Sequence, residues 1–204
     1  MLSKFTAFSL AALTLATLAH ACGEERWPVK TLADKSGRAI SRLRPEPATI
    51  RQLTSIAGHE RKELLHAEST RFPEEKHVYK VAALIIGYKV EGDSDFHIVL
   101  ADPTNPQITM IAEIPAGSCA PKDLAKTFDG LQQAFSGMLS KPTAKFKKLA
   151  KPIPATFVGV GFFDFLHGQT GVAPNGFELH PVIGFELPPI YNYSTGESVV
   201  FKGK

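Results

Sequence analysis

The chain has 204 residues, of which 44% are hydrophobic and 21% are charged, and its formal net charge at pH 7 is +3. One domain is enough for this length. A net charge this close to zero specifies no partner. The only cysteines, Cys22 and Cys119, form no C-x-x-C pattern, which excludes a dithiol redox motif and a thiolate zinc site.

Residues 1–21 predict a secretory signal peptide. Lys4 supplies the positive start, Phe8 to Ala19 supply an apolar core, and Ala19-His20-Ala21 is a small-x-small cleavage site. No later segment approaches the roughly 20 apolar residues of a transmembrane helix. We therefore expect a secreted or periplasmic protein after cleavage near Ala21. Its formal charge falls to +2, because Lys4 leaves with the signal.

The two cysteines have three interpretations. An even count in an oxidising compartment predicts a disulfide between Cys22 and Cys119, which would tie the mature N-terminus to the turn after the third strand. One alternative is a pair of unpaired thiols, and in the other Cys22, as the first mature residue, carries a lipid.

Residues 22–76 predict an N-terminal arm with one short helix. The stretch from Cys22 to Pro47 is polar and without periodicity, so we expect an extended arm, held against the domain by Trp27. Thr49 is a predicted N-cap for a helix through Ile56. Residues 58–76 are charged, which favours a loop.

Residues 77–187 predict a five-stranded barrel. A helix beginning at Pro121 follows the third strand, and its apolar stripe includes Phe128 and Phe135 at helical spacing. Gly159 and Gly161 in the fourth strand indicate sharp curvature or close backbone approach. This order matches the OB-fold, a mainly β Greek-key barrel with a helix between strands three and four. The predicted strands span residues 78–90, 95–101, 108–114, 156–165 and 177–187, and residues 188–204 form a C-terminal tail.

The loop between the predicted fourth and fifth strands is one of two with which OB-folds hold ligands. It is rich in glycine and carries polar side chains at its ends. The candidate ligand-binding residues are therefore Asp164, His167, Gln169 and Asn175. The alternative is that these side chains hydrogen-bond the loop into shape.

Two His–carboxylate pairs recur on the strands. Asp95 with His97, and Glu178 with His180, are two residues apart and so project to the same face of a strand. If Glu113 joins them, the cluster can bind a divalent ion, zinc or calcium, or act as acid and base without a metal. The predicted metal ligands are Asp95, His97, Glu178 and His180, and the candidate catalytic residues are His97, Glu113 and His180. Cross-strand hydrogen bonds without any function are the alternative.

A basic run follows the predicted helix. It contains no acidic residue and comprises Lys141, Lys145, Lys147, Lys148 and Lys151. Such a run attracts phosphates or an anionic surface, or is simply a solvated linker.

Several of these segments together resemble a family of small exported bacterial proteins of unassigned activity. The likeness covers most of the mature chain and implies bacterial origin and export. It rests on residues 25–31, 49–56, 94–97, 109–115 and 159–182.

A looser likeness is to the staphylococcal-nuclease type of OB barrel. Glu91-Gly92-Asp93 and residues 99–103 are similar to its calcium-binding strands and turns. The chain departs from that pattern because no arginine follows Arg71, whereas the nuclease type clamps phosphate with arginines.

The leading functional prediction is an exported, monomeric OB-fold binding module for nucleic acid or an oligosaccharide. One alternative is a divalent-metal-dependent hydrolase, such as a phosphodiesterase, that uses His97, Glu113, Glu178 and His180. A second alternative is a structural or protein-interaction domain.

Overall fold

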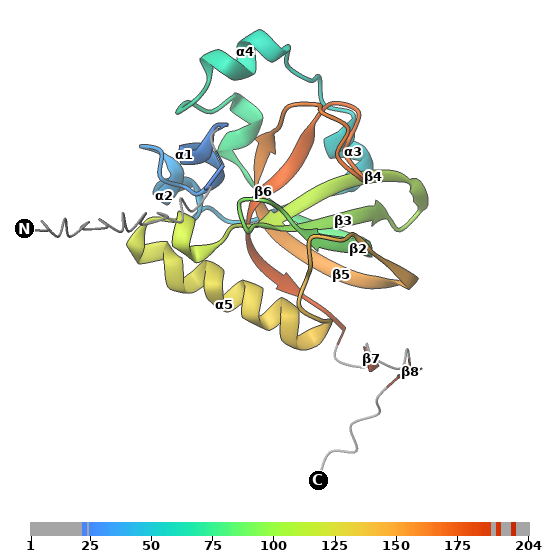
Figure 1. The fold of residues 1–204 in the computed structure, drawn as a ribbon. Helices are drawn as coiled ribbons and strands as arrows, with labels where there is room; N and C mark the ends of the chain where they lie inside the picture. Colours follow the sequence, from blue (N-terminus) through green and yellow to red (C-terminus); the bar gives the residue numbers. More distant parts are fainter. Residues whose placement is uncertain (1–21, 24, 189–190, 193–196, 199–204) are drawn as a thin grey trace, which may run out of the picture.

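The computed structural model describes residues 22–23, 25–188, 191–192 and 197–198. The predicted signal peptide and most of the predicted C-terminal tail lie outside the described residues. Figure 1 shows the element order along the chain.

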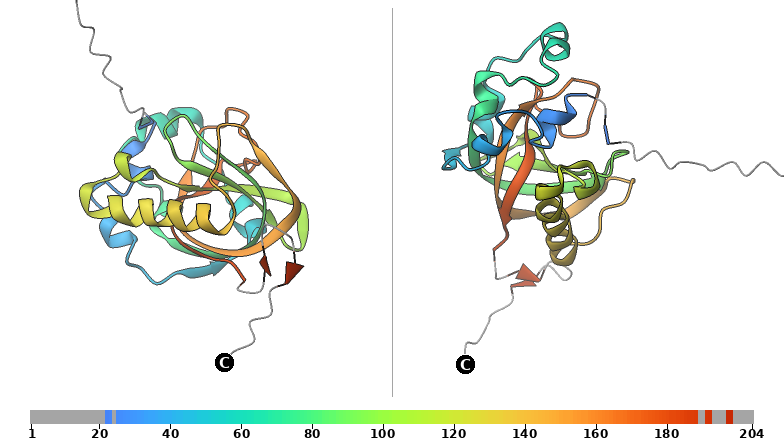
Figure 2. Two further views of the ribbon diagram at one scale, coloured as in Figure 1. Left: turned by 60° about the horizontal axis from the view of Figure 1, so that its bottom comes forward. Right: turned by 90° about the vertical axis from the view of Figure 1, so that its left-hand side faces the viewer.

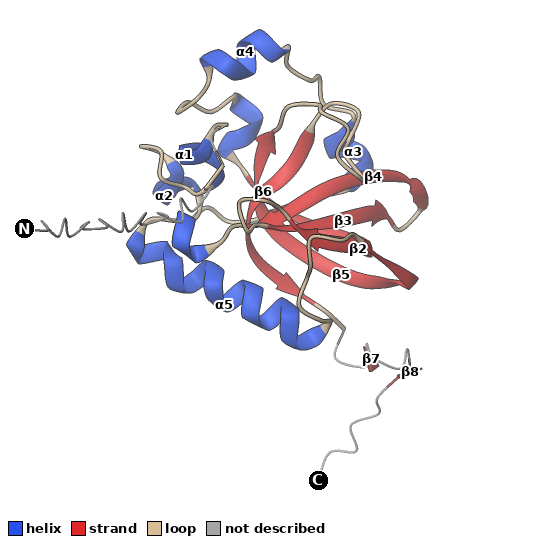
Figure 3. Cartoon of the chain, viewed as in Figure 1, coloured by secondary structure: helices blue, strands red, loops and turns tan. Residues whose placement is uncertain are grey.

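Six strands form one mixed sheet: β1 (Glu46–Ala48), β2 (Val78–Val90), β3 (Phe96–Asp102), β4 (Asn105–Ile114), β5 (Lys147–Phe163) and β6 (Phe177–Glu186). Their order is β1-β2-β3-β4-β6-β5 (Figure 3). Because β2 also pairs with β5, hydrogen bonds connect five of the strands, β2 to β6, in a ring. The β4–β6 contact is parallel and covers only two residue pairs. The registers of β2 and β5 also shift within their ladders. The sheet is therefore nearly closed without being a regular barrel.

Helices flank this sheet. The longest is α5 (Lys122–Met138), which connects β4 to β5 as predicted and lies along one side of the sheet (Figure 2). The short elements are α1 (Trp27–Lys30), α2 (Gly37–Ile40), α3 (Ile50–Thr54), α4 (Arg61–His66), the 3-10 turns η1 (Pro73–Lys76) and η2 (Gly117–Cys119), and the strand pair β7 (Tyr191–Asn192) and β8 (Glu197–Ser198).

The arm and the charged segment differ from the sequence-based prediction. The expected extended arm contains α1, α2 and β1, and the expected loop contains α4 and η1. Each of these elements has six residues or fewer, which is too short to show a hydrophobic period. The helix α3 was predicted from Thr49 as its N-cap, although it ends at Thr54 and not at Ile56; Thr49 and Gln52 form a reciprocal capping box at its start.

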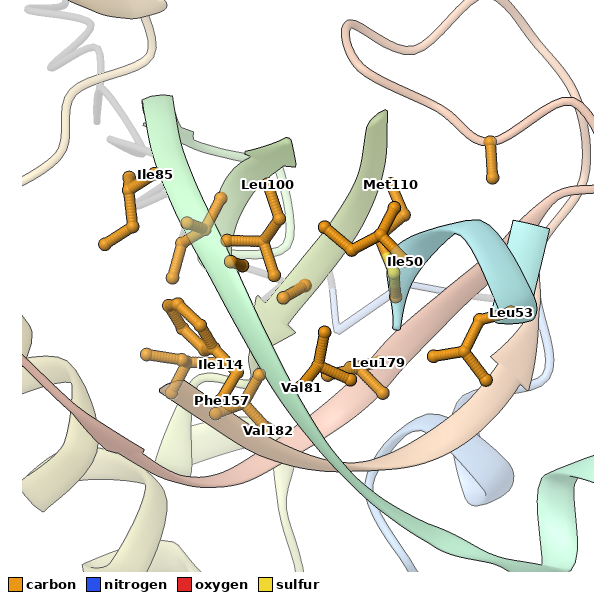
Figure 4. Close-up of a cluster of buried hydrophobic side chains, with 14 of the residues drawn as sticks. Ile50, Leu53, Val81, Ile85, Leu100, Met110, Ile114, Phe157, Leu179 and Val182 are labelled. Atoms are coloured by element: carbon orange, nitrogen blue, oxygen red, sulfur yellow. The ribbon is translucent and has the colours of Figure 1, made fainter. Parts of the chain in front are cut away.

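The core lies inside the sheet. Alternation along β3 turns Phe96, Ile98 and Leu100 inward, where they join Val81, Phe157 and other apolar side chains (Figure 4). From α5, Phe135 enters this cluster and Phe128 a smaller one nearby.

Close backbone approach at the β5 glycines is confirmed. A Cβ on Gly161 would lie 2.7 Å from the carbonyl oxygen of Glu74, and one on Gly159 would lie 2.9 Å from Cβ of Leu179. Only glycine allows η1 and β6 to pack this closely on β5.

Arg26, the neighbour of Trp27, anchors the arm. Trp27 is half-buried, whereas Arg26 is 2% exposed. The Arg26 guanidinium uses all five N–H donors on buried or half-buried acceptors: both carboxylate oxygens of Glu75 and the carbonyls of Ala67, Thr70 and Phe163. Complete pairing makes burial of this charge tolerable.

The predicted disulfide is confirmed. Cys22 and Cys119 are bonded, with their Cα atoms 5.2 Å apart, and the bond ties the arm to η2 just after β4. A bonded Cys22 has no free thiol to carry a lipid. The disulfide indicates an oxidising compartment. Among the described residues, no helix is long and apolar enough to cross a membrane.

Candidate functional site

Five polar residues gather on the outer face of β3, β4 and β6, opposite the core: Asp95, His97, Glu113, Glu178 and His180. Because Phe96 and Ile98 point inward, the alternation of β3 turns His97 outward. His97 then lies directly across the β3–β4 ladder from Glu113. All five residues are 9% exposed or less, so this face of the sheet is buried.

The loop between β5 and β6 covers part of this face. Gly171, with φ +82°, packs directly on Val99 of β3, where any Cβ would clash with the valine side chain. This packing brings the carbonyl oxygen of Thr170 within 2.9 Å of Nε2 of His97. The glycine-rich sequence of the loop thus allows it to lie flat on the sheet.

Glu113 joins the two histidines. Its Oε1 lies 2.8 Å from Nδ1 of His97, and its Oε2 lies 3.2 Å from Nδ1 of His180. Burial opposes ionisation of Glu113, but the hydrogen bond from His97 and the charges of His180 and Lys30 outweigh it. The pKa of Glu113 is therefore below its ordinary value.

His180 is fully buried and lies close to several carboxylates. Its Nδ1 lies 3.2 Å from Oε1 of Glu178, and its Nε2 lies 3.3 Å from Oδ2 of Asp95 in an ion pair without hydrogen-bond geometry. Burial disfavours the imidazolium, yet contacts with Asp95 and Glu178 and the charge of Glu113 raise the pKa of His180 to about 10. Burial and the charge of Glu113 raise the pKa of Glu178. A charged His180 therefore offsets part of the negative charge of this group.

His97 stands in a different arrangement. A carbonyl oxygen can only accept a hydrogen bond, so Nε2 of His97 carries a proton and donates it to Thr170. Its Nδ1 faces Oε1 of Glu113 at 2.8 Å and Oε1 of Glu91 at 3.2 Å. Burial disfavours the charged ring, but the hydrogen bond with Glu113 and its charge raise the pKa of His97. Without a metal, a proton on Nδ1 of His97 therefore lies between the carboxylates of Glu91 and Glu113 and attracts both.

Two groups of side chains have ligand atoms within 4.8 Å of one another, as a metal site requires: Glu91, His97 and Glu113, and Asp95, Glu113 and His180. The second group is buried throughout. The first opens through Glu91 and Glu113 into a pocket of about 670 Å³. Two of the three residues of the first group line this pocket, whereas the second group reaches it only through Glu113, which both groups share.

Acidic side chains dominate the wall of this pocket. Its ionisable residues are Glu25, Lys30, Lys89, Glu91, Asp93, Glu113, Asp164 and His167. Lys30 comes from the arm, and its Nζ lies 3.6 Å from Oδ1 of Asp164. Burial works against the ammonium, but the charges of Asp164, Glu113 and Glu178 raise the pKa of Lys30. Oδ1 of Asp164 is buried and accepts no hydrogen bond from the described residues.

The predicted loop residues divide into two groups. Asp164, His167 and Gln169 line the pocket. The side chain of Gln169 also shapes the loop, since it bonds Asp164, the carbonyl of Phe165 and the backbone of His167. Asn175 lies elsewhere and ties the carbonyls of Leu53 and Ile56 to the start of β6.

Sequence reasoning did not single out Lys30, and it pointed to Glu91 only through the loose likeness of Glu91-Gly92-Asp93 to a calcium-binding turn. Lys30 lies in α1 and reaches the site only because Arg26 and the disulfide hold the arm there. Glu91 follows β2 and looks like an ordinary turn residue. The position of Glu91 in the sequence was one available signal for a role in the site. Glu91 and the predicted site residue Asp95 lie on either side of the β2–β3 turn, where Glu91 N–H donates to Asp95 O at 2.9 Å.

Asp102, which belongs to the nuclease-like pattern, lies at the other end of β3. Its carboxylate accepts hydrogen bonds from the backbone of Arg51, Thr104 and Asn105. It therefore caps a turn instead of joining Glu91 and Asp93.

No family model matches this chain, and a comparison with curated proteins also finds no match.

Proposed function

We propose that this protein binds one divalent metal ion between Glu91, His97 and Glu113, at the inner end of the acidic pocket. The observation that carries the proposal is the hydrogen bond from Nε2 of His97 to Thr170, 2.9 Å long. Metal-bound histidines commonly donate their second ring nitrogen to a carbonyl in this way, which directs the other nitrogen at the ion.

The chemistry of the ligand set favours zinc or a similar transition metal. Imidazole nitrogen suits zinc, copper, iron and nickel, whereas calcium takes oxygen ligands. The ion would replace the Nδ1 proton of His97 and lie between two carboxylates already within 3.2 Å of that nitrogen. The neighbouring group of Asp95, Glu178 and His180 helps to position the proposed ligands, because His180 contacts the second carboxylate oxygen of Glu113.

Metal titration of the mature, untagged protein, after chelator treatment, tests this proposal. We expect about one equivalent of zinc, lost in His97→Gln and Glu113→Gln. His66→Gln is the matched control, because His66 is exposed on α4 and, among the described residues, its side chain bonds only the carbonyl of Lys62. Folding of each variant is checked by circular dichroism. Absence of saturable binding, or equal binding in His97→Gln, would contradict the proposal.

Metal-dependent hydrolysis is the second candidate function. It is favoured by the size of the pocket, which exceeds what an ion needs, and by Oδ1 of Asp164, which is buried and accepts no hydrogen bond from the described residues. A divalent ion would supply Lewis acidity there, and Asp164 would accept a proton from the attacking water. We expect zinc-loaded protein to cleave an activated ester or phosphodiester, and Asp164→Asn to keep zinc while losing cleavage. Cleavage that survives in Asp164→Asn would show that Asp164 does not accept the proton from the attacking water.

The order of the five ringed strands agrees with that of the OB-fold, which supports the proposal that this sheet is a distorted OB barrel. Export to a periplasmic or extracellular space agrees with the disulfide. Nucleic acid is a weaker proposal for this pocket, because carboxylates outnumber lysines on its wall and repel phosphate.

A further inference from the structure

A second, smaller pocket adjoins the acidic pocket. We call it the leucine pocket; it has a volume of about 160 Å³ and is lined by Glu25, Arg26, Leu64, Leu65, Glu68 and Phe165. The two pockets share Glu25, and Phe165 directly follows Asp164, which lies in the wall of the acidic pocket. A small ligand held at Glu25 can therefore reach into both pockets.

The inner wall of the leucine pocket is apolar. Leu64 and Phe165 are buried, and the five N–H donors of Arg26 are all bonded to other partners. Leu65, on α4, lies in the same wall and is 58% exposed, so a ligand in the pocket would remove apolar surface of this side chain from water. An enclosed cavity of about 150 Å³ accommodates benzene, and the leucine pocket thus has room for one aromatic ring.

Two exposed carboxylates, those of Glu25 and Glu68, accompany these apolar groups. Among the described residues, neither carboxylate takes part in an ion pair or a hydrogen bond. The exposed guanidinium of Arg61 lies 4.8 Å from the centroid of the Phe165 ring and offsets only part of their charge. In the adjoining acidic pocket, carboxylates outnumber lysines five to two. The negative potential of both pockets therefore favours a cationic ligand.

We propose that the leucine pocket and Glu25 bind a small primary amine that carries one apolar side chain. The apolar side chain fills the leucine pocket, and the ammonium pairs with Glu25, where the two pockets meet. Apolar burial and one charge pair then act on neighbouring groups of the same ligand. A carboxylate on the ligand would face the same negative walls, so an amide of an apolar amino acid suits this site better than the free amino acid.

Amine binding does not depend on the proposed metal ion. Glu25 and Leu65 are not among the proposed ligands Glu91, His97 and Glu113. A divalent ion at those ligands would also leave the wall of the acidic pocket negative, because its carboxylates exceed its lysines by three. The amine can therefore be tested on protein that holds no metal.

Calorimetric titration of the mature protein in a chelator tests the proposal. The probes are phenylalaninamide, glycinamide, which lacks the apolar side chain, and N-acetylphenylalaninamide, which lacks the charge. The titrations are made at about pH 6, below the usual pKa of an α-amino group. The test variants are Leu65→Ser and Glu25→Gln. The controls are Leu43→Ser and Glu186→Gln, which make the same changes at exposed positions elsewhere. Thermal unfolding confirms that each variant folds.

We expect phenylalaninamide to bind about tenfold more tightly than glycinamide, because its ring is buried. It should bind roughly fivefold more tightly than N-acetylphenylalaninamide, because only the ammonium pairs with Glu25. Leu65→Ser should reduce the first difference and Glu25→Gln the second, while both controls keep them.

Equal binding of the three probes would overturn the proposal, as would equal losses in the test and control variants or no saturable binding of phenylalaninamide. Zinc titration of Leu65→Ser separates the two proposals, because this variant should bind zinc as the unmodified protein does. A protein that binds zinc but not the amine refutes only the amine site, and one that binds the amine but not zinc refutes only the metal site.

Discussion

Arg26 and Glu75 form a completely buried two-pronged ion pair, with N–O distances of 2.6 and 2.8 Å, although 49 residues separate them. Removing one partner leaves the other charge buried and unpaired, which costs about 3–5 kcal/mol. We therefore expect Arg26→Met and Glu75→Gln each to lower the free energy of urea unfolding by that amount.

The control for this prediction is the exposed pair of Arg38 and Asp123, which has the same two-pronged geometry with both distances 2.9 Å. Solvent screens this pair, so Arg38→Gln should change stability little. Similar losses in the buried and exposed variants would show that burial of Arg26 does not control the stability of the arm.

Gly161→Ala should destabilise the fold. Its Cβ would lie 2.7–2.8 Å from Glu74 backbone and from the rings of Tyr79 and Phe177, and overpacking of this kind costs about 1–3 kcal/mol. Gly130→Ala is the matched control, because Gly130 lies within α5 with open space around it. There alanine should stabilise by about 1 kcal/mol through helix propensity. Thermal unfolding of both variants measures the contrast, and a stabilised Gly161→Ala would contradict it.

Reduction of the disulfide should lower stability markedly. Cys22 and Cys119 close a loop with a sequence separation of 97, for which chain entropy predicts a loss of about 4–5 kcal/mol. Urea unfolding with and without a reductant measures the loss, and the double Cys→Ser variant should match the reduced protein. Because Arg26 still holds the arm, circular dichroism of the reduced protein in water should stay native. An unchanged unfolding midpoint would refute this prediction.

Acid should weaken the Asp34–Arg71 pair. Burial opposes ionisation of Asp34, but hydrogen bonds from Arg71 at 2.7 and 3.1 Å, together with its charge, lower the pKa of Asp34. A group with a depressed folded pKa stabilises above its unfolded pKa, about 3.9 for Asp, and this stability is lost as pH falls through the folded pKa. Wild type should thus exceed Asp34→Asn in unfolding midpoint at neutral pH, and the difference should shrink below about pH 4. A difference independent of pH would contradict this assignment.

Lys30→Gln should raise the affinity for a divalent ion. The ammonium of Lys30 interacts with Glu113, one of the proposed ligands. Removing one nearby positive charge favours binding of a cation by about 1 kcal/mol, or roughly fivefold. Lys35→Gln, an exposed change elsewhere on the arm, is the control. Zinc affinity that falls in Lys30→Gln would indicate that this lysine positions the ligands instead of opposing the ion.

The five strands of the ring, α3 and α5 could be predicted because their signals are local. The alternation of Phe96, Ile98 and Leu100 with His97 directly implies the two faces of β3. The capping box at Thr49 and the stripe containing Phe128 and Phe135 are likewise read from neighbouring positions. Four-residue helices such as α1 are too short to show such periodicity.

The sequence by itself determined which side chains share a face along β3 and β6, and it favoured a disulfide between the two cysteines. Only the tertiary structure decided that this polar face is buried, that Lys30 and Glu91 share its pocket, and that Asn175 does not. The reason is that alternation and capping act between residues a few positions apart. The pocket instead requires closure of the strand ring and docking of the arm, which join residues as distant in sequence as Lys30 and Asp164.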